Sequence, residues 1–391
     1  MSAPLALIAA WARSAVAPRG GAFNALHPHE IAEPVLQALL QRAGLPVSAL
    51  DAVVLGNALG AGGNPARMLA LQAGLPQRCA ALTVDTQCCA GLDAVAMGAA
   101  LIASGQAHVV IAGGAEAWSR SPIRMHRPIR ADELPVSFER PAFAPNPEQD
   151  PDMLEAAALY AAQHAYTRVE QEAYALQSHV RAVNSQAHLA AEIVSVVGVQ
   201  HDTYPRLIEP SRAARMPTVA NAPGADLHVS GLSALTISAQ ADGAALVLLM
   251  SDQACARWQV SAPMTLAAHA AVGVAPDVPL IAAEHAAHDV LRRAGGLKAS
   301  DLALVELHDA FAVQGLSFAK GLGLAPEQLN LHGGGLARGH PIGASAAVAL
   351  VRLLSDMTRL TQPNAAGLVA VAGAGGLGSA AVIKRMGLSQ V

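Results

Sequence analysis

Residues 84–95 read Val84-Asp85-Thr86-Gln87-Cys88-Cys89-Ala90-Gly91-Leu92-Asp93-Ala94-Val95. A short β-prone run ends at Val84, and an apolar, alanine-rich helix is predicted from Gly91 to Ser104. A cysteine between the end of a strand and the start of a helix lies near the positive end of the helix dipole. This position favours the thiolate, which is the nucleophilic form of the side chain. The stretch alone leaves open the alternative that Cys88 and Cys89 are small buried apolar residues.

Length and composition bound the class of protein. A chain of 391 residues is too long for one ordinary core, so we expect two or more domains. Hydrophobic residues make up 53% and charged residues 14%, which indicates that much of the chain is buried within domains or between subunits. The net charge of −4 and the lack of a basic run speak against nucleic acid as the main partner.

Cysteine spacing and apolar runs bear on the compartment and on membranes. The four cysteines, Cys79, Cys88, Cys89 and Cys255, have neither disulfide-framework nor zinc spacing, so we expect a reducing cytoplasm and no bound metal. No basic segment precedes the apolar residues 5–11, so we interpret them as a first strand rather than a signal peptide. No run of about 18 apolar residues occurs, and no membrane span is expected.

Two parts of the sequence repeat one αβ unit. Residues 41–57 match residues 292–308 in pattern and spacing, and the agreement continues through the cysteine stretch and the following glycines. Such self-similarity predicts two copies of the same structural unit. The equivalent positions are Asn57 and His308, Cys88 and His340, Gly91 and Gly343, and Gly113 and Gly373.

Residues 119–231 lie outside the repeat. They begin with a loop rich in proline and arginine and contain two predicted helices, at about 152–165 and 168–190. An insertion beside a duplicated core is typical of a lid or a substrate holder. We therefore predict an N-terminal half (1–118 plus 232–260), an inserted loop domain (119–231) and a C-terminal half (261–391).

The matching loop ends of the two halves predict one shared site, because ligands of open α/β sheets bind beyond the strand ends. Cys88, His308 and His340 are expected there. A nucleophilic thiol needs a base, usually histidine, and a second histidine can donate to a carbonyl oxygen that gains charge. Residues 373–378 are rich in glycine and can supply further backbone N–H groups. Taken singly, His308 could be a core histidine and His340 a loop residue.

At these residues the chain resembles the thiolase family, acyl-CoA:acetyl-CoA C-acyltransferases, over nearly its whole length. The resemblance implies an α/β, five-layer αβαβα fold from two duplicated halves, an inserted loop domain that holds coenzyme A, and a homodimer or homotetramer. The residues that carry it are Leu55-Gly56-Asn57, Gly63-Asn64-Pro65-Ala66-Arg67, the Cys88 stretch, Ala112-Gly113-Gly114-Ala115-Glu116, Ala241-Asp242-Gly243-Ala244-Ala245, His308-Asp309-Ala310-Phe311, Gly333-Gly334-Gly335-Leu336-Ala337-Arg338-Gly339-His340-Pro341-Ile342-Gly343-Ala344-Ser345 and Gly375-Gly376-Leu377-Gly378.

The resemblance also implies roles for single residues. Cys88 takes the acyl group, His340 activates it, and His308 helps to polarise the thioester oxygen. The backbone N–H groups of Cys88 and Ala374 form an oxyanion site. His308 followed by Asp309 is nearer to the sterol-carrier-protein-type branch of the family.

For substrate binding, the resemblance implies coenzyme A thioesters as substrates and no resident cofactor. Met153, Ser238 and one of Arg212 or Arg215 fall near family positions that contact coenzyme A. The alternative for either arginine is a solvated surface side chain.

The chain departs from the family pattern where thiolases carry a second reactive cysteine. Ala372 and Ala310 occupy the two places known for it. Alanine transfers no proton, and general acid–base help is worth roughly 10²–10⁴-fold in rate. Cys89 is the remaining thiol that could substitute, although it directly follows Cys88. The Cys-His-His set that remains resembles that of ketoacyl synthases, which condense by decarboxylation or pass on an acyl group.

Three hypotheses follow. The first is an acyl-CoA C-acyltransferase that works through an acyl-Cys88 intermediate. The second is an acyl transferase or decarboxylative condensing enzyme of a specialised pathway, with a Cys-His-His set. The third is a non-catalytic thiolase-like subunit that binds acyl-CoA. Retention of Cys88 and His340 speaks against the third, and Ala372 and Ala310 speak against the first.

Overall fold

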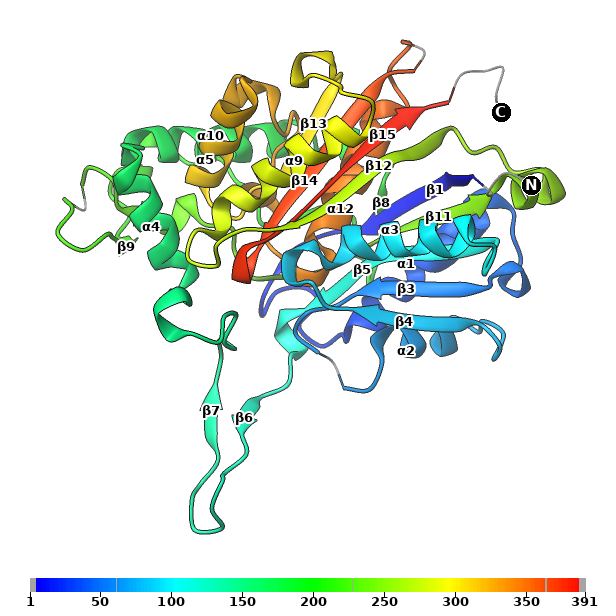
Figure 1. The fold of residues 1–391 in the computed structure, drawn as a ribbon, viewed down its shortest axis with the longest axis horizontal. Helices are drawn as coiled ribbons and strands as arrows, with labels where there is room; N and C mark the ends of the chain where they lie inside the picture. The colour runs from blue at the N-terminus through cyan, green and yellow to red at the C-terminus, as the bar shows by residue number, and fades with distance from the viewer. Residues whose placement is uncertain (1–4, 61, 227, 363, 387–391) are drawn as a thin grey trace.

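The fold is built on one mixed β-sheet in two similar halves (Figure 1). The computed structural model describes residues 5–60, 62–226, 228–362 and 364–386, and within them the sheet has 11 strands. In sheet order the main strands are β13 (Leu304–His308), β14 (Ala366–Gly373), β15 (Leu377–Arg385), β12 (Met264–Gly273), β1 (Ala6–Ser14), β11 (Ala241–Ser251), β5 (Val109–Ala117), β3 (Ala52–Gly56) and β4 (Ala80–Val84).

The pairing directions confirm the predicted duplication. β3 is parallel to β5, and the equivalent β13 is parallel to β14. β11 is antiparallel to its neighbours β1 and β5, and the equivalent β15 is antiparallel to β12 and β14. β1 joins the halves by a short antiparallel contact with β12, at Leu7–Thr265 and Ile8–Met264.

Helices cover both faces of each half of the sheet and give the five layers that the resemblance implied. α3 (Ala90–Ala103) and α12 (Ser345–Met357) contact each other and pack between the halves. The outer layer of the first half holds α1 (Pro28–Ala43) and α2 (Pro65–Gln72). The outer layer of the second half holds α9 (Ala282–Arg293) and α10 (Ala312–Leu322). No helix in the described part of the chain is both long and apolar enough to cross a membrane.

Local sequence signals explain the bounds of these helices. Pro28 begins α1, the Glu30 carboxylate accepts the backbone N–H of His27 at 2.7 Å, and Gly44 ends the helix at φ 64°. The helix predicted from Gly91 to Ser104 is α3, and a single 3₁₀ turn, Gln87–Cys89, precedes it. This turn brings Cys88 to the junction of β4 and α3, as predicted.

The predicted insertion holds two helices, α4 (Met153–Gln163) and α5 (Arg168–Asn184). The Thr167 hydroxyl caps the start of α5 by accepting the backbone N–H of Glu170. Where one helix was predicted to continue to about residue 190, the chain instead breaks at Ser185 and forms the short α6 (Gln186–Leu189). Shorter elements of the insertion are α7 (Pro210–Ala213), β8 (Ile193–Val194), which pairs with β1, and β9 (Thr218–Ala220), which pairs with β10 (Leu232–Ser233). The domain limits at 118, 231 and 260 stay a prediction.

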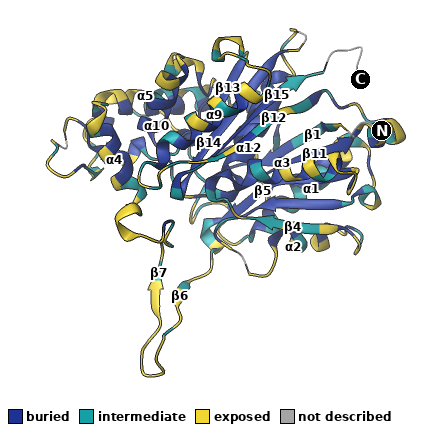
Figure 2. Ribbon diagram, viewed as in Figure 1, coloured by how far each residue is buried: buried dark blue, intermediate teal, exposed yellow. Residues whose placement is uncertain are grey.

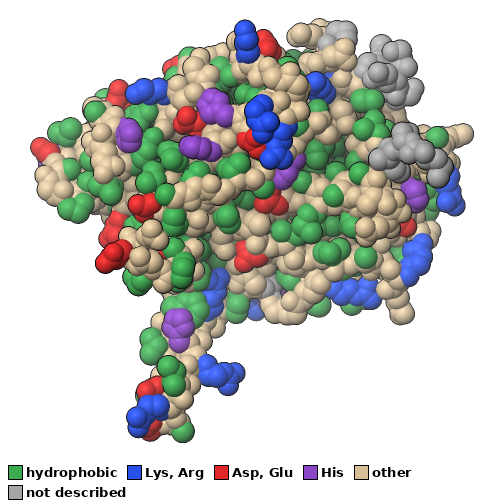
Figure 3. Space-filling model, in the orientation of Figure 1, with side chains coloured by type: hydrophobic (Ala, Val, Ile, Leu, Met, Phe, Trp, Pro, Cys, Tyr) green, Lys and Arg blue, Asp and Glu red, His purple; other side chains and the backbone are tan. Residues whose placement is uncertain are grey.

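A β-hairpin of the insertion stands away from the rest of the molecule (Figures 1 and 2). Its strands are β6 (Arg124–His126) and β7 (Val136–Phe138), and Arg124 pairs with Phe138 at its base. Figure 3 shows basic and hydrophobic side chains along it. Ile129 is 97% exposed, so the tip makes almost no contact with the core.

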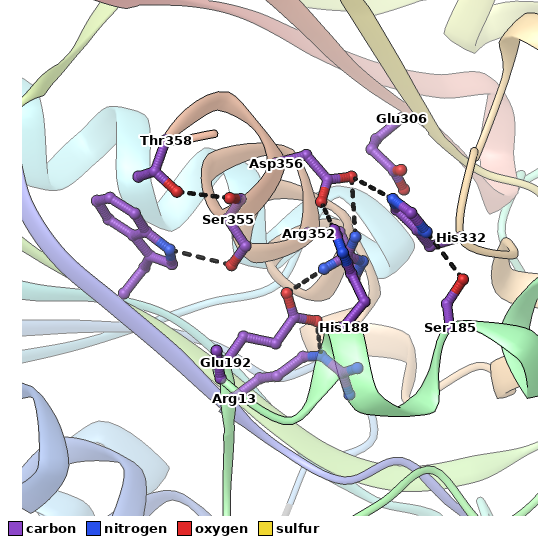
Figure 4. Close-up of polar contacts among 12 residues, drawn as sticks. Arg13, Ser185, His188, Glu192, Glu306, His332, Arg352, Ser355, Asp356 and Thr358 are labelled. Carbon is purple, nitrogen blue, oxygen red and sulfur yellow. Dashed lines mark hydrogen bonds and ion pairs between the residues drawn. The ribbon is translucent and has the colours of Figure 1, made fainter. Parts of the chain in front are cut away.

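A buried ionic network ties the insertion to the core (Figure 4). Glu192 accepts from Arg13 Nε of β1 at 2.7 Å and also from Arg352 of α12. Arg13 forms a second, two-pronged pair with Asp202 at 2.7 and 2.9 Å. Arg352 also pairs with Asp356 one helical turn along, at 2.9 Å. Because the members come from β1, α12 and the insertion, the network fixes three segments relative to one another.

Candidate active site

Cys88 lies where the first half of the repeat brings a strand end and a helix start together. The preceding Gln87 has φ 55°, a left-handed backbone that is unusual for a non-glycine residue. This conformation makes the tight turn between β4 and α3. Cys88 is 8% exposed and lines a cavity of about 650 Å³.

His340 lies at the equivalent place of the second half and contacts the thiol directly. Its Nε2 is 3.1 Å from Cys88 Sγ. Its Nδ1 is 2.7 Å from the hydroxyl of Ser345, which donates its own proton to the Pro341 carbonyl at 3.0 Å. The hydroxyl must therefore accept from Nδ1–H, because its one proton is already used. This leaves Nε2 of the neutral ring as a proton acceptor that faces the thiol.

His308, at the end of β13, packs against the other side of His340. The two rings stack with centroids 4.5 Å apart. His308 is 3% exposed, and its Nε2 has no hydrogen-bond partner among the described residues. A Cβ on Gly335 would lie 2.7 Å from the His308 ring, so glycine there makes room for the ring. The structure thus brings together the three side chains predicted for the site, although His308 is not among the residues that line the cavity.

Burial sets the protonation states of the pair. Burial raises the pKa of Cys88 to about 12, and it lowers the pKa of His340 to about 4. The backbone N–H groups of Ala374 and Cys88 lower the pKa of the thiol, but their effect does not outweigh burial. The prediction that the helix start favours the thiolate is therefore wrong, because burial shifts the pKa of the thiol and that of the imidazole toward their neutral forms.

Glu116 joins the loops that carry the site, and the sequence did not single it out as a functional residue. Its buried carboxylate accepts the side-chain amide of Asn57 at 2.6 Å and the backbone N–H of Ala58 at 2.8 Å. It also accepts the N–H of Gly343, three residues after His340, at 3.0 Å. Burial raises the pKa of Glu116 to about 7. The signal that could have identified Glu116 as a site residue is its position at the end of β5, beside the end of β3.

Glycines allow the two halves to approach closely at the site. A Cβ on Gly114 would lie 2.1 Å from the carbonyl oxygen of Gly343, and one on Gly56 would lie 2.6 Å from the same atom. Real Cβ atoms do not approach backbone this closely, so the His340 turn packs onto β3 and β5 only because these positions are glycine.

The residues predicted to bind coenzyme A divide into two groups. Met153 and Ser238 line the cavity, and the Ser238 hydroxyl donates to the Gly335 carbonyl at 2.6 Å. Arg212 and Arg215 are exposed and do not line it.

The two alanines at the places predicted for a second cysteine face the cavity. Ala310 and Ala372 both line it, as does Ala374 with its predicted oxyanion N–H. Cys89 does not, because its Sγ turns into the core, 3.9 Å from the Val371 carbonyl oxygen. Burial also raises the pKa of Cys89 well above its ordinary value. These observations argue against Cys89 as the substitute acid or base.

One cluster away from this cavity has donor atoms close enough to hold a metal ion. In the described chain the ligand atoms of His188, His332 and Asp356 lie within 4.8 Å of one another (Figure 4). The Asp356 carboxylate is already paired with Arg352 at 2.9 Å and with His188 at 2.7 Å. We assign no metal to it.

The duplicated α/β fold, with a cysteine and a histidine at matching helix starts, defines a class of protein. Comparison with known proteins identifies this class. The model of the N-terminal domain of thiolase matches residues 6–253, and that of the C-terminal domain matches residues 260–385. The chain belongs to the thiolase family.

Relatives and solved structures agree with this assignment. An acetyl-CoA acetyltransferase from Rhizobium meliloti is 34% identical over 99% of this chain and 100% of its own length. An acetyl-CoA acetyltransferase from Thiocystis violacea is 32% identical over 96% of this chain and 97% of its own length. The crystal structure of the Bacillus anthracis acetyl-CoA acetyltransferase superposes with a TM-score of 0.90 at 28% identity, over 98% of this chain and 100% of that one. The Acat5 thiolase from Ascaris suum, solved in complex with coenzyme A, gives 0.88 at 27% identity with the same coverage.

Proposed function

We propose that the protein is an acyl-CoA C-acyltransferase that works through an acyl-Cys88 thioester. The contact between Cys88 Sγ and His340 Nε2, 3.1 Å long and oriented by Ser345, carries the proposal. The family membership and the names of the relatives support the class of reaction.

The first half-reaction uses the neutral pair directly. Cys88 Sγ attacks the thioester carbonyl carbon while its proton passes to His340 Nε2. The carbonyl oxygen gains negative charge and is proposed to lie against the N–H groups of Cys88 and Ala374, which favour a negative charge here because they lower the pKa of the thiol. The C–S bond to coenzyme A then breaks, and the departing sulfur takes the proton back from His340.

His308 is assigned to the oxygen of the second thioester. Its Nε2 is buried and has no hydrogen-bond partner among the described residues, so it is free to pair with the oxygen of a bound carbonyl group. Coenzyme A thioesters are then substrates rather than resident cofactors, with Met153 and Ser238 on the cavity wall. Arg212 or Arg215 remains a proposed contact only for a part of coenzyme A outside the cavity. A homodimer or homotetramer in the cytoplasm also remains a proposal.

A second candidate function, decarboxylative condensation or plain acyl transfer, is favoured by Ala310 and Ala372. Both face the cavity where an acid or base for α-proton transfer would be needed. Loss of carbon dioxide generates the carbanion without a base, so neither reaction of this second class needs the missing cysteine.

The test is intact-protein mass spectrometry after exposure to acetyl-CoA, longer acyl-CoA and malonyl-CoA. We expect the acyl mass on Cys88 in the natural protein and no adduct in Cys88→Ala. A Cys88 thiol that is alkylated by iodoacetamide but takes no acyl group would overturn both enzymatic proposals and favour a binding subunit. Adding a second thioester to the acylated protein then separates the two reactions. Condensation with malonyl-CoA alone supports the decarboxylative candidate.

A further inference from the structure

The cavity wall carries two arginines and two carboxylates, and only one of the two arginines forms a salt bridge with another described residue. Arg140 is neutralised by a two-pronged pair with Asp150, at 3.0 and 2.5 Å. Asp152 caps α4 by accepting the Leu154 N–H at 2.8 Å. Glu139 is exposed, and no ion pair joins it to another described residue. The fourth is Arg124, which forms no salt bridge within the described chain.

The backbone holds the Arg124 guanidinium at the wall. Its Nη2 donates to the Leu59 carbonyl oxygen at 3.0 Å, and the side chain is half-buried at the base of the hairpin. Leu59 is itself held by Glu116, whose carboxylate accepts the Leu59 N–H at 3.3 Å and the Gly343 N–H at 3.0 Å. The cation is thus connected through two residues to the turn that carries His340.

The remaining donors of Arg124 are available to a ligand. In the part of the chain that the structure describes, Nε and Nη1 form no hydrogen bond. A guanidinium with free donors binds carboxylate or phosphate oxygens in a fixed geometry. The wall of the cavity is mostly apolar and suits a methylene chain or a pantetheine arm. Its large apolar members include Phe143, Met153, Leu154, Ile237, Leu280 and Phe311.

We propose that Arg124 is an anion-binding, specificity-determining residue for the thioester substrate. Its ligand is an oxyanion carried by that substrate, either a carboxylate at the far end of the acyl group or a phosphate of coenzyme A. The assignment rests on the proposed function, because the thioester is taken to bind beside Cys88. Binding can still be measured without catalysis, so the two proposals can fail separately.

The experiment measures dissociation constants by calorimetry in the Cys88→Ser background, which allows binding without stable acyl transfer to sulfur. The probes are hexanoyl-CoA, adipyl-CoA and hexanoyl-pantetheine, which differ in the terminal carboxylate and in the phosphates. Arg124→Ala and Arg124→Lys are compared with Arg127→Ala, a matched control because Arg127 lies on the same hairpin, is exposed and does not line the cavity.

We expect Arg124→Ala to weaken binding by about 10- to 100-fold for the probe that carries the anion, as for loss of a charged hydrogen bond. Arg124→Lys should recover part of it, and Arg127→Ala should change nothing. Loss confined to adipyl-CoA assigns the carboxylate. Equal loss for both coenzyme A esters, but not for hexanoyl-pantetheine, assigns a phosphate. Unchanged binding of all three probes, or equal loss that includes hexanoyl-pantetheine, overturns the proposal. Anion binding that depends on Arg124, together with no acyl adduct on Cys88 of the natural protein, would refute the proposed function alone.

Discussion

The hydroxyl of Ser345 decides which ring nitrogen of His340 carries the proton. It is fully buried, and its proton is committed to the Pro341 carbonyl, so it can only accept from Nδ1–H. Replacing it with alanine leaves Nδ1–H without an acceptor and frees the ring to turn. We expect Ser345→Ala to slow acylation of Cys88 by roughly 10-fold or more, because an unsatisfied buried group costs about 1–3 kcal/mol. Rapid-quench mass spectrometry of the acyl adduct measures the rate.

Ser355→Ala on the same helix is the matched control, because Ser355 accepts from the Trp11 indole at 3.1 Å and lies outside the cavity. It should leave acylation unchanged. Equal rates in Ser345→Ala and in the natural protein would show that another group orients His340.

Ala372 occupies one of the two places predicted for an acid or base in α-proton transfer. It lines the cavity, as Cys88 does, and a thiol there could exchange a proton with a bound α-carbon. We expect Ala372→Cys to raise thiolytic or condensing turnover by roughly 10²-fold or more, the usual worth of general acid–base help. Steady-state release or consumption of acetyl-CoA measures it.

Ala234→Cys adds a thiol elsewhere on the same cavity wall and serves as the control. It should not change the turnover. No gain in Ala372→Cys would mean that this step does not limit the rate, and it would favour the decarboxylative or plain-transfer reaction.

At the scale of elements, the turn after His340 depends on close backbone packing. A Cβ on Gly343 would lie 2.6 Å from Cα of Asn57, and backbone cannot rotate away as a side chain can. We expect Gly343→Ala to lower the free energy of unfolding by about 1–3 kcal/mol through overpacking. It should also move His340 away from Cys88, so that acylation falls. Urea unfolding and the acylation rate together measure both effects.

Gly273→Ala is the comparison, because a Cβ at the end of β12 meets nothing within 4 Å. Its free energy of unfolding should be unchanged or rise by about 0.4–1 kcal/mol. Equal effects of the two substitutions would contradict the close-packing argument.

At the scale of the whole molecule, Glu192 is the carboxylate shared by the arginines of β1 and α12. Arg13 and Glu192 are both almost fully buried, so water cannot replace the lost partner. We expect Glu192→Ala to lower the free energy of unfolding by about 3–5 kcal/mol, as for removal of one member of a buried ion pair. Unfolding in urea measures this free energy, because urea is uncharged and does not screen the ion pairs.

Asp132→Ala is the matched control on an exposed pair. Arg130 and Asp132 are 71% and 72% exposed, and such pairs contribute about 1 kcal/mol or less. If both substitutions cost the same, the buried network does not hold the insertion to the core.

Much of the fold could be predicted because its signals are local. The glycine that ends α1, the apolar run of β5 and the repeated spacing that leads to Asn57 and His308 are all readable along the chain. Periodicity fixes the type of an element, and a repeated order of elements fixes its topology. The meeting of Cys88 with His340 follows from that repeat.

The electrostatics of the site could not be predicted this way. A helix start predicted a thiolate at Cys88, but the layers packed around it raise the pKa of the thiol instead. The position of Arg124 on the cavity wall could not be predicted either. The insertion contains many arginines, and the sequence does not distinguish Arg124 from an exposed one such as Arg212.

The sequence by itself determined the duplicated α/β fold, the thiolase resemblance and the cysteine and histidine of the candidate site, because these depend on residue type and spacing. Only the tertiary structure decided that Ser345 orients His340, that Cys89 faces the core, and that Arg124 faces the cavity with no charged partner among the residues the structure describes. The physical reason is that burial, side-chain direction and hydrogen-bond partners depend on segments that lie far apart in the chain and meet only when it folds.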